Sequence, residues 1–239
     1  MSVPQKIRCV IERIHDHGGH VYSIDLKPER QLPQFRPGQF LHLAIDPYEP
    51  GDFWPESRVF SIASNPADRN KLSLTYSVVG SFTKRMEQTL KVGSVAWVKL
   101  PYGDFVIDKT GEVVLIAGGT GITAFTAFLD GTTSKDDQKV TLFYGARNRD
   151  LLIFSPLVER KLKEVEKISA WYFIEEGQTN EESHTINGRL SAEIILQKIH
   201  LVNNPVFFLS GPPAMLQKLT SDLLSHGITA DSIKTDAWE

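Results

Sequence analysis

Cysteine is nearly absent from this sequence, with one thiol, Cys9, among 239 residues. One cysteine cannot close a disulfide within the chain. It also cannot supply a cysteine-based structural zinc site or a four-cysteine iron–sulfur cluster. A chain this poor in thiols fits a reducing compartment. The sequence is therefore not that of a disulfide-rich protein or of a protein with a four-cysteine iron–sulfur cluster.

Basic residues are not in excess either. Lys and Arg total 26 and Asp and Glu total 29, so the net charge is −3. A general nucleic-acid binder usually carries a basic excess, so we expect no nucleic-acid partner. No apolar run approaches the ~18 residues of a spanning helix, and the segment Met1–Cys9 has no apolar signal-peptide core. We therefore expect no membrane span and a cytoplasmic location.

The length allows two domains of ordinary size, at about 150 residues each. Hydrophobic residues make up 41% and charged residues 23% of the chain, a balance typical of globular proteins. The residue pattern changes near residue 110. We predict an N-terminal antiparallel β-barrel over residues 1–109 and a C-terminal α/β domain with a parallel sheet over residues 110–239. The linker is expected near Asp108–Gly111.

The first half consists of short apolar runs separated by turn formers such as Gly18-Gly19 and Pro37-Gly38. About six strands at such spacing favour a small antiparallel barrel. A short helix is expected at Ser81–Leu90. The expected strands are Lys6–Ile14, His20–Leu26, Gln39–Ile45, Arg58–Ala63, Lys71–Val79 and Ser94–Leu100.

In the second half, continuous apolar strands alternate with helical segments. This alternation indicates βαβ units in a parallel sheet that is covered on both faces. The expected strands are Val113–Ala117, Val140–Tyr144, Ile168–Ile174 and Val206–Leu209. The expected helices are Ile122–Leu129, Leu157–Lys167, Ala192–Ile199 and Ala214–Ser225.

A glycine-rich loop, Gly118-Gly119-Thr120-Gly121, follows the first of these strands and precedes a helix. Ligands of open α/β sheets bind beyond the carboxyl ends of the strands. Glycine lets a backbone approach a pyrophosphate, and a helix N-terminus offers free N–H groups. The loop lacks the full G-x-G-x-x-G fingerprint, so nucleotide binding and simple turn chemistry both fit it.

Arginine occupies the end of the second strand, where NAD-specific units carry a carboxylate for the ribose hydroxyls. Arg147 and Arg149 follow Val140–Tyr144. They could receive a 2′-phosphate through bidentate contacts or simply be solvated. A third loop, Ser210–Met215, comes to the same sheet edge and places a hydroxyl there, although it also reads as an ordinary helix start.

Two segments of the first half suit phosphate and ring recognition. Alternation along Arg58-Val59-Phe60-Ser61 puts Arg58 and Phe60 on one face, a cation beside an aromatic ring. Gly80-Ser81-Phe82-Thr83 opens a helix and would hold a second phosphate or only cap the helix. An ordinary half-buried strand is the alternative for the first segment.

Three histidines, His15, His17 and His20, cluster with Asp16. Imidazole and carboxylate ligands suit first-row metals. The segment reads as a hairpin tip, however, and no second ligand cluster accompanies it. We predict that the chain has no metal site.

Taken in order, these motifs resemble those of the ferredoxin–NADP reductase superfamily, from about residue 6 to the end. Arg58–Ser61 matches the R-x-[Y/F]-S flavin motif, and Gly80–Thr83 matches the G-x-x-[S/T] phosphate motif. Gly118–Thr123 matches the glycine-rich nicotinamide motif. Tyr144–Arg147 is similar to the strand end near the adenosine ribose, Ser210–Met215 to the C-G-P-x-x-M motif, and Asp236–Trp238 to the acidic–x–aromatic ending.

The resemblance implies a FAD-binding barrel and an NAD(P)-binding α/β domain. It implies catalytic positions for Ser61, Ser210 and Asp236, and it places Phe60 against the isoalloxazine. The implied cofactor-binding residues are Arg58, Phe60, Ser61, Ile62, Tyr76, Ser77, Val78, Val79, Gly80, Ser81, Phe82, Thr83, Gly118, Gly119, Thr120, Gly121, Arg147, Arg189, Gly211, Pro212, Met215 and Trp238.

The chain departs from the family pattern at three positions. Ser210 replaces the usual cysteine, which bears on the efficiency of hydride transfer. Ala124 replaces a common proline. Asp236 replaces the more usual glutamate and is one methylene shorter.

The implied activity is hydride transfer from NADPH or NADH to bound FAD, followed by electron transfer to a ferredoxin, a flavodoxin or a small-molecule acceptor. Arg147, with Arg189, favours NADPH, although a lone arginine there also occurs in NADH-using relatives. One alternative is a flavin reductase that uses flavin as a diffusing substrate, against which the Gly80–Thr83 phosphate motif argues. The other is a non-catalytic nucleotide-binding subunit, which Ser210 would suit. The sequence does not indicate the acceptor, the pathway or the oligomeric state.

Overall fold

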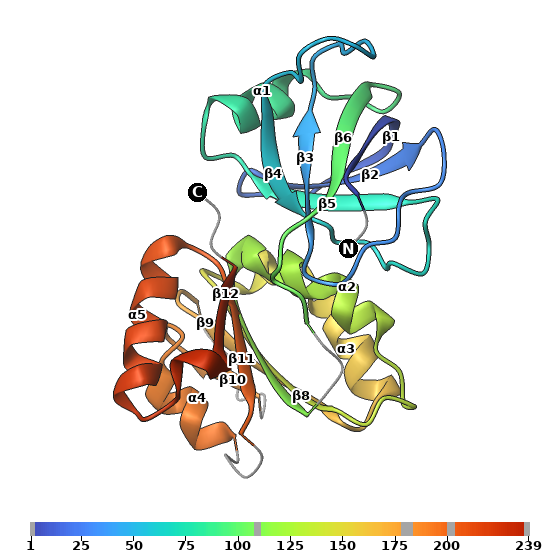
Figure 1. The fold of residues 1–239 in the computed structure, drawn as a ribbon. Helices are drawn as coiled ribbons and strands as arrows, with labels where there is room; N and C mark the ends of the chain where they lie inside the picture. Colours follow the sequence, from blue (N-terminus) through green and yellow to red (C-terminus); the bar gives the residue numbers. More distant parts are fainter. Residues whose placement is uncertain (1–2, 108–110, 178–183, 200–203, 237–239) are drawn as a thin grey trace. The chain divides into compact units, whose positions relative to one another are not determined.

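The computed structural model describes residues 3–107, 111–177, 184–199 and 204–236. They form two units (Figure 1), one of residues 1–106 with 126–131 and one of residues 107–125 with 132–239. Each unit holds a six-stranded sheet. The predicted antiparallel near-barrel and parallel α/β sheet are both confirmed. Residues 108–110 of the expected linker lie outside the described residues.

The first unit is an antiparallel sheet with strand order β4-β3-β6-β1-β2-β5. Just beyond β4, the Ala63 amide donates to the carbonyl of Ser73 in β5, at 2.9 Å. This bond joins the two ends of the strand order and gives the near-barrel its closure. The elements are β1 (Gln5–Asp16), β2 (Val21–Pro28), β3 (Phe40–Ala44), β4 (Ser57–Ser61), β5 (Leu72–Ser77), α1 (Ser81–Thr89) and β6 (Val95–Tyr102).

Alternation along the strands fills the interior of this barrel. In β1, Ile7, Cys9 and Ile11 are fully buried while the residues between them are not, as a period of two requires. The helix α1 adds Phe82 and Met86 to the same core. The alternating residues of β1 and the apolar residues of α1 therefore contribute to one core.

The one thiol lies inside this core. Burial, assisted by Glu29, raises the pKa of the Cys9 thiol to about 12, whereas an unfolded thiol ionises near ~8.5. Folding therefore disfavours the thiolate, so this group lowers stability as the pH rises above ~8.5 and has no effect well below that. We expect a thiol reagent at pH 8 to leave folded protein unmodified and to modify one thiol after urea denaturation. Rapid reaction of the folded protein would contradict this.

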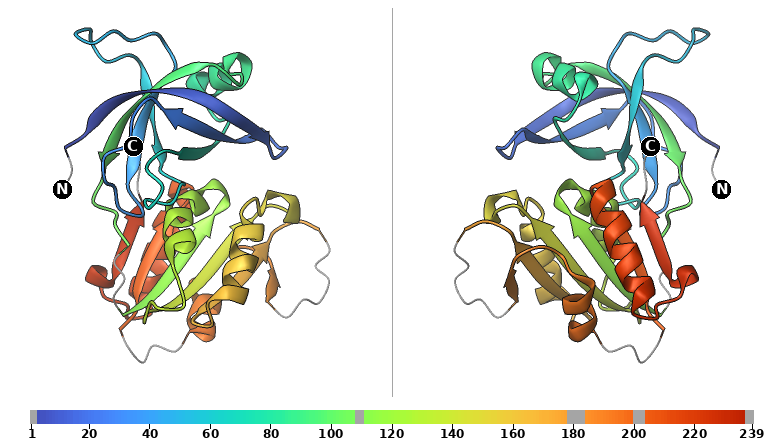
Figure 2. Two further views of the ribbon diagram at one scale, coloured as in Figure 1. Left: turned by 90° about the vertical axis from the view of Figure 1, so that its right-hand side faces the viewer. Right: turned by 90° about the vertical axis from the view of Figure 1, so that its left-hand side faces the viewer.

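The second unit is a parallel sheet with strand order β10-β9-β8-β7-β11-β12. The helix α3 lies on one face, and α4 and α5 lie on the other (Figure 2). The elements are β7 (Glu112–Gly118), the start of α2 (Thr123–Gly131, of which residues 126–131 belong to the first unit), β8 (Lys139–Ala146), α3 (Ser155–Glu164), β9 (Ile168–Ile174), β10 (Thr185–Asn187), α4 (Ala192–Lys198), β11 (Val206–Ser210), α5 (Pro213–Ser225) and β12 (Ile233–Asp236).

The core of this unit explains why its strands are apolar throughout. All seven residues of β7 are buried, because helices or loops cover both faces of the sheet. The edge strands β10 and β12 were not predicted from the sequence, because three and four residues are too few to show a strand pattern. Within the described residues, no helix combines the length and apolarity needed to cross a membrane.

Candidate functional site

The glycine loop follows β7 directly and makes a tight turn before α2. Gly118 is the last residue of β7, and residues 119–122 form one 3₁₀ turn. Gly119 has a φ of +54°, in the left-handed region that favours glycine. A Cβ added at Gly119 would meet nothing within 4 Å. The backbone is therefore open at this point, as a pyrophosphate cradle requires.

Two neighbouring glycines have a packing role. A Cβ at Gly121 would lie closer than 3.0 Å to the backbone of Ser210 and Gly211, and a Cβ at Gly118 would collide with Met215. The glycine loop and the loop after β11 are therefore in direct contact. The structure thus brings two of the predicted motifs together, and it assigns Gly118 and Gly121 to loop packing while Gly119 faces open space.

The third motif reaches the same sheet edge through β12. Ser210 and Asp236 are register partners in the parallel pair β11–β12, and the Ser210 hydroxyl donates to Asp236 Oδ2 at 2.9 Å. Both side chains are 3% exposed. Ser210 and Asp236, predicted as catalytic from widely separated segments, therefore form one buried hydrogen-bonded pair. Trp238, predicted beside them, lies outside the described residues.

This pair should support stability as well as chemistry. We expect Ser210→Ala to lower the free energy of unfolding by about 1–3 kcal/mol, because it removes a donor from a buried carboxylate. Urea denaturation measures this loss. Ser210→Cys, which keeps a weak donor, should fall between wild type and alanine. If the Ser210→Ala variant were as stable as wild type, the hydrogen bond would not contribute to the stability of the fold.

Charged residues gather where β8, β9 and β10 end. Arg147 follows β8, and its Nε lies 3.5 Å from Glu176, which follows β9. Arg189, after β10, donates to Glu175 Oε2 at 2.8 Å. Both arginines are mostly exposed, yet each is paired with a carboxylate. Sequence reasoning missed these glutamates, although their signal was present, because Glu175-Glu176 directly follows the predicted strand Ile168–Ile174.

In the first unit, two arginines and a carboxylate meet beside the start of α1. The Arg58 guanidinium donates to Glu56 Oε1 at 2.8 Å, and Arg85 Nη2 lies 3.5 Å from Glu56 Oε2. Arg85 also donates to Asp46 at 2.8 Å. Both guanidinium groups lie over the buried Phe82 ring, at 5.1 and 5.5 Å from its centre. Arg85, Glu56 and Asp46 were not predicted from the sequence.

The phosphate-type turn before α1 is held by its own threonine. The Thr83 hydroxyl accepts from the amides of Val79 and Gly80, at 3.0 and 3.1 Å. Val79 and Ser81 remain exposed, and a Cβ at Gly80 would meet nothing within 4 Å. Thr83 therefore acts as a structural cap, and the turn keeps an open outer side.

The predicted ring-binding residues lie in two environments. Phe60 is half-buried, with its ring edge toward Tyr76 at 6.2 Å between centres. Ser61 is buried on the neighbouring position of β4. Ile62 lies within the barrel core, and its amide donates to the Gln39 carbonyl. Ser77 and Val78 are half-buried at the end of β5.

Two of the three histidines near the β1–β2 turn lie within hydrogen-bond distance of another side chain. His17 Nε2 lies 2.8 Å from Ser23 Oγ, and His20 Nδ1 lies 2.8 Å from Glu87 Oε1. Burial and the neighbouring His15 lower the pKa of His17. Among the described residues, no group of three potential ligands is placed to hold a metal ion.

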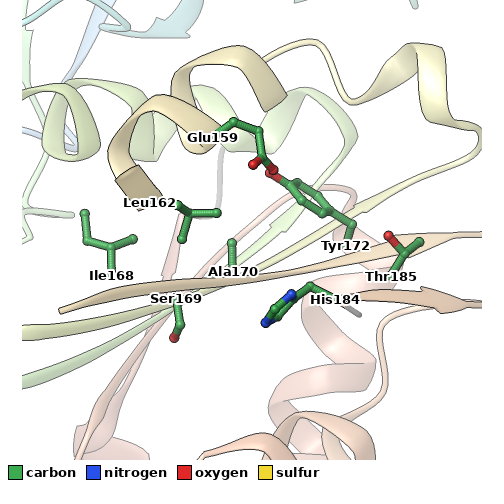
Figure 3. A pocket seen from close by; sticks show the side chains of 8 residues that line it. All are labelled: Glu159, Leu162, Ile168, Ser169, Ala170, Tyr172, His184 and Thr185. Carbon is green, nitrogen blue, oxygen red and sulfur yellow. The ribbon is translucent and has the colours of Figure 1, made fainter. Parts of the chain in front are cut away.

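A separate cavity of about 350 Å³ lies in the second unit, along β9 and α3 (Figure 3). It is lined by Leu162, Ala170 and His184 among others, with Tyr172 donating to Glu159 at 2.7 Å. No residue expected to bind flavin or nucleotide lines it. The cavity is therefore distinct from the loops at the carboxyl ends of the strands.

An antiparallel near-barrel followed by a parallel α/β sheet is the two-domain fold typical of ferredoxin–NADP reductases. Residues 115–220 match the oxidoreductase NAD-binding domain family. The phenol 2-monooxygenase reductase component DmpP of Pseudomonas sp. (strain CF600) is 31% identical over 157 residues, covering 64% of this chain and 42% of that protein. The chain is therefore similar in sequence to oxidoreductase NAD-binding domains and to a reductase component, and its fold is that of ferredoxin–NADP reductases.

Other relatives extend over more of the chain. A flavohemoprotein of Oceanobacillus iheyensis is 24% identical over 239 residues, 96% of this chain and 58% of that protein. A ferredoxin NADP⁺ reductase of Neisseria gonorrhoeae, solved with bound FAD and NADP, has a TM-score of 0.80 at 16% identity and covers 99% of both chains. The chain spans roughly half the length of the curated relatives it matches.

Proposed function

We propose that the chain binds FAD through the first unit and NADH or NADPH through the second, and moves electrons from the nucleotide to a separate acceptor. The observation that supports this proposal most strongly is that two loops and a buried side-chain pair meet at one sheet edge. The open glycine turn, the loop after β11 and the buried Ser210–Asp236 pair all lie there. Such an edge is where open α/β sheets bind nucleotides.

The first unit fits a flavin dinucleotide by the chemistry of its donors. Arg58 and Arg85 already hold the carboxylate of Glu56, which stands in for an oxyanion. The turn at Gly80 offers open backbone at the start of α1. The half-buried Phe60 ring supplies apolar surface, with the buried Tyr76 ring packed against it. A pyrophosphate beside a planar ring system would use all of these groups.

Each residue has a defined task in this proposal. The cofactors supply the redox chemistry when bound, because reduced nicotinamide donates a hydride that flavin accepts. Arg58 and the α1 turn hold the pyrophosphate, and Ser61 offers a hydroxyl to the ring edge. Ser210 and Asp236 hold the nicotinamide end, with Asp236 fixing the direction of the serine hydroxyl.

The paired charges bear on the choice of nucleotide. A 2′-phosphate carries close to two negative charges. To bind it, Arg147 or Arg189 would have to be free of a neighbouring carboxylate. Both are already paired with glutamates, and those carboxylates would repel the phosphate while accepting hydrogen bonds from ribose hydroxyls. The charges therefore support NADH over NADPH, against the preference that the arginines alone suggested.

The electron acceptor is proposed to be a separate protein or a small molecule. The single cysteine provides no iron–sulfur cluster within this chain. A reductase component and flavohemoproteins are among the relatives, and such names favour a partner or additional domain that receives the electrons. Candidate acceptors are a ferredoxin, a flavodoxin or an oxygenase component.

Anaerobic stopped-flow spectroscopy tests the proposal. The purified protein, loaded with FAD, should show a flavin spectrum that bleaches on mixing with NADH or NADPH and returns on adding an acceptor. A protein that binds no flavin and oxidises neither nucleotide would rule the proposal out. Flavin that separates completely on gel filtration, with turnover intact, would favour the flavin-reductase alternative instead.

A further inference from the structure

One carboxylate in the barrel occupies both arginines at once. Glu56 places Oε1 2.8 Å from Arg58 and Oε2 3.5 Å from Arg85. Arg85 has a second acid, Asp46, at 2.8 Å, whereas Glu56 alone among the described residues pairs with both guanidinium groups. Two cations and two carboxylates therefore form a nearly neutral cluster.

The two guanidinium groups rest on an aromatic ring, and Glu56 is exposed enough to exchange with another anion. The buried Phe82 ring lies under both guanidinium groups. Asp46, which follows β3, accepts a hydrogen bond from Arg85. Glu56 is about half exposed, and its partners hold it only through its two carboxylate oxygens. Exposed ion pairs of this kind are weak and exchange readily.

We propose that Glu56 is a built-in competitor for the phosphate groups of the flavin, so that the cofactor must displace its carboxylate from Arg58 and Arg85. This rests on the proposed function, because it assumes that FAD binds to this barrel. A carboxylate and a phosphate oxygen make the same charge-assisted bonds to a guanidinium. Glu56 therefore lowers flavin affinity and neutralises the arginines in the free protein.

The test compares flavin affinities of the full chain by fluorescence titration, without any turnover. Glu56→Gln keeps the side-chain size and removes the charge. We expect it to bind FAD and FMN about five- to tenfold more tightly than wild type, because both carry phosphate. Riboflavin has no phosphate, so its affinity should be unchanged by the substitution.

Glu49→Gln is the matched control. It removes one exposed carboxylate from the same loop, but Glu49 forms no ion pair with Arg58 or Arg85. Its FAD affinity should stay within about twofold of wild type. A second background, Arg85→Gln, removes one of the two cations that Glu56 holds. There, Glu56→Gln should tighten FAD by less than in the wild-type background, which shows that the two residues act together.

The outcomes separate the inference from the function beneath it. Weaker or unchanged FAD binding in Glu56→Gln would overturn the competitor role and leave flavin binding itself intact. Equal tightening of riboflavin, or equal tightening by Glu49→Gln, would also overturn it, because the effect would then not involve phosphate displacement. If wild type and every variant bind no flavin, the proposed function fails and the inference fails with it.

Discussion

Gly121→Ala should lower the free energy of unfolding of the second unit by about 3 kcal/mol or more. The new Cβ would lie closer than 3.0 Å to the backbone of Ser210 and Gly211. Backbone atoms cannot rotate away as a side chain can, so one of the two loops must move. Because Ser210 bonds to Asp236, the displacement would reach that buried pair.

Urea denaturation followed by circular dichroism measures the loss in free energy of unfolding. Nucleotide affinity reports whether the displacement extends to the Ser210–Asp236 pair. Gly131→Ala is the matched control, since its φ lies outside the left-handed region and the nearest atom is 3.9 Å from the added Cβ. We expect Gly131→Ala to change the free energy of unfolding by no more than ~1 kcal/mol. A Gly121→Ala protein as stable as that control would mean that the two loops do not pack as described.

The glycine loop shows both the reach and the limit of sequence reasoning. Its position after a buried strand follows from apolar periodicity, which is a local property. The sequence alone left nucleotide binding and turn chemistry equally open for these glycines. Only the pairing of β7 with β11 reveals that Gly118 and Gly121 face another loop, and such non-local contacts leave no trace in the local pattern.

The Ser210–Asp236 pair was expected from the family resemblance, not from spacing. The two residues are 26 positions apart, and β12 is too short for its four residues to show a strand pattern. Motif order across the whole chain supplied what periodicity could not. Residue roles at this pair remain proposals, while the fold that joins them is established.

The charged clusters were the least predictable part of the site. Arg58 and Arg147 were singled out because a guanidinium suits phosphate. Their acidic partners come from a neighbouring loop in one case and from another strand end in the other. The Arg147–Glu176 pair depends on which strands are adjacent. Glu56, in contrast, lies only two residues before Arg58 and was missed although it is local in sequence.

The second large prediction concerns Glu175 and Glu176, the two carboxylates that follow β9 and pair with Arg189 and Arg147. Glu175→Gln/Glu176→Gln should raise kcat/KM for NADPH about tenfold, because two repulsive charges near the proposed 2′-phosphate position are removed and Arg147 and Arg189 become unpaired. The value for NADH should change by less than about threefold or fall. The ratio of the two specificity constants, measured at one ionic strength, reports the effect without depending on protein stability.

The control is Glu166→Gln/Glu193→Gln, which removes two exposed carboxylates that pair with neither arginine. It should leave the NADPH-to-NADH ratio within about twofold of wild type, because only general electrostatics then remain. In wild type, the difference in kcat/KM between NADH and NADPH should also become smaller as added salt screens the exposed charges. If both double variants shift the ratio equally, net charge governs the preference, and the glutamates after β9 do not select the nucleotide.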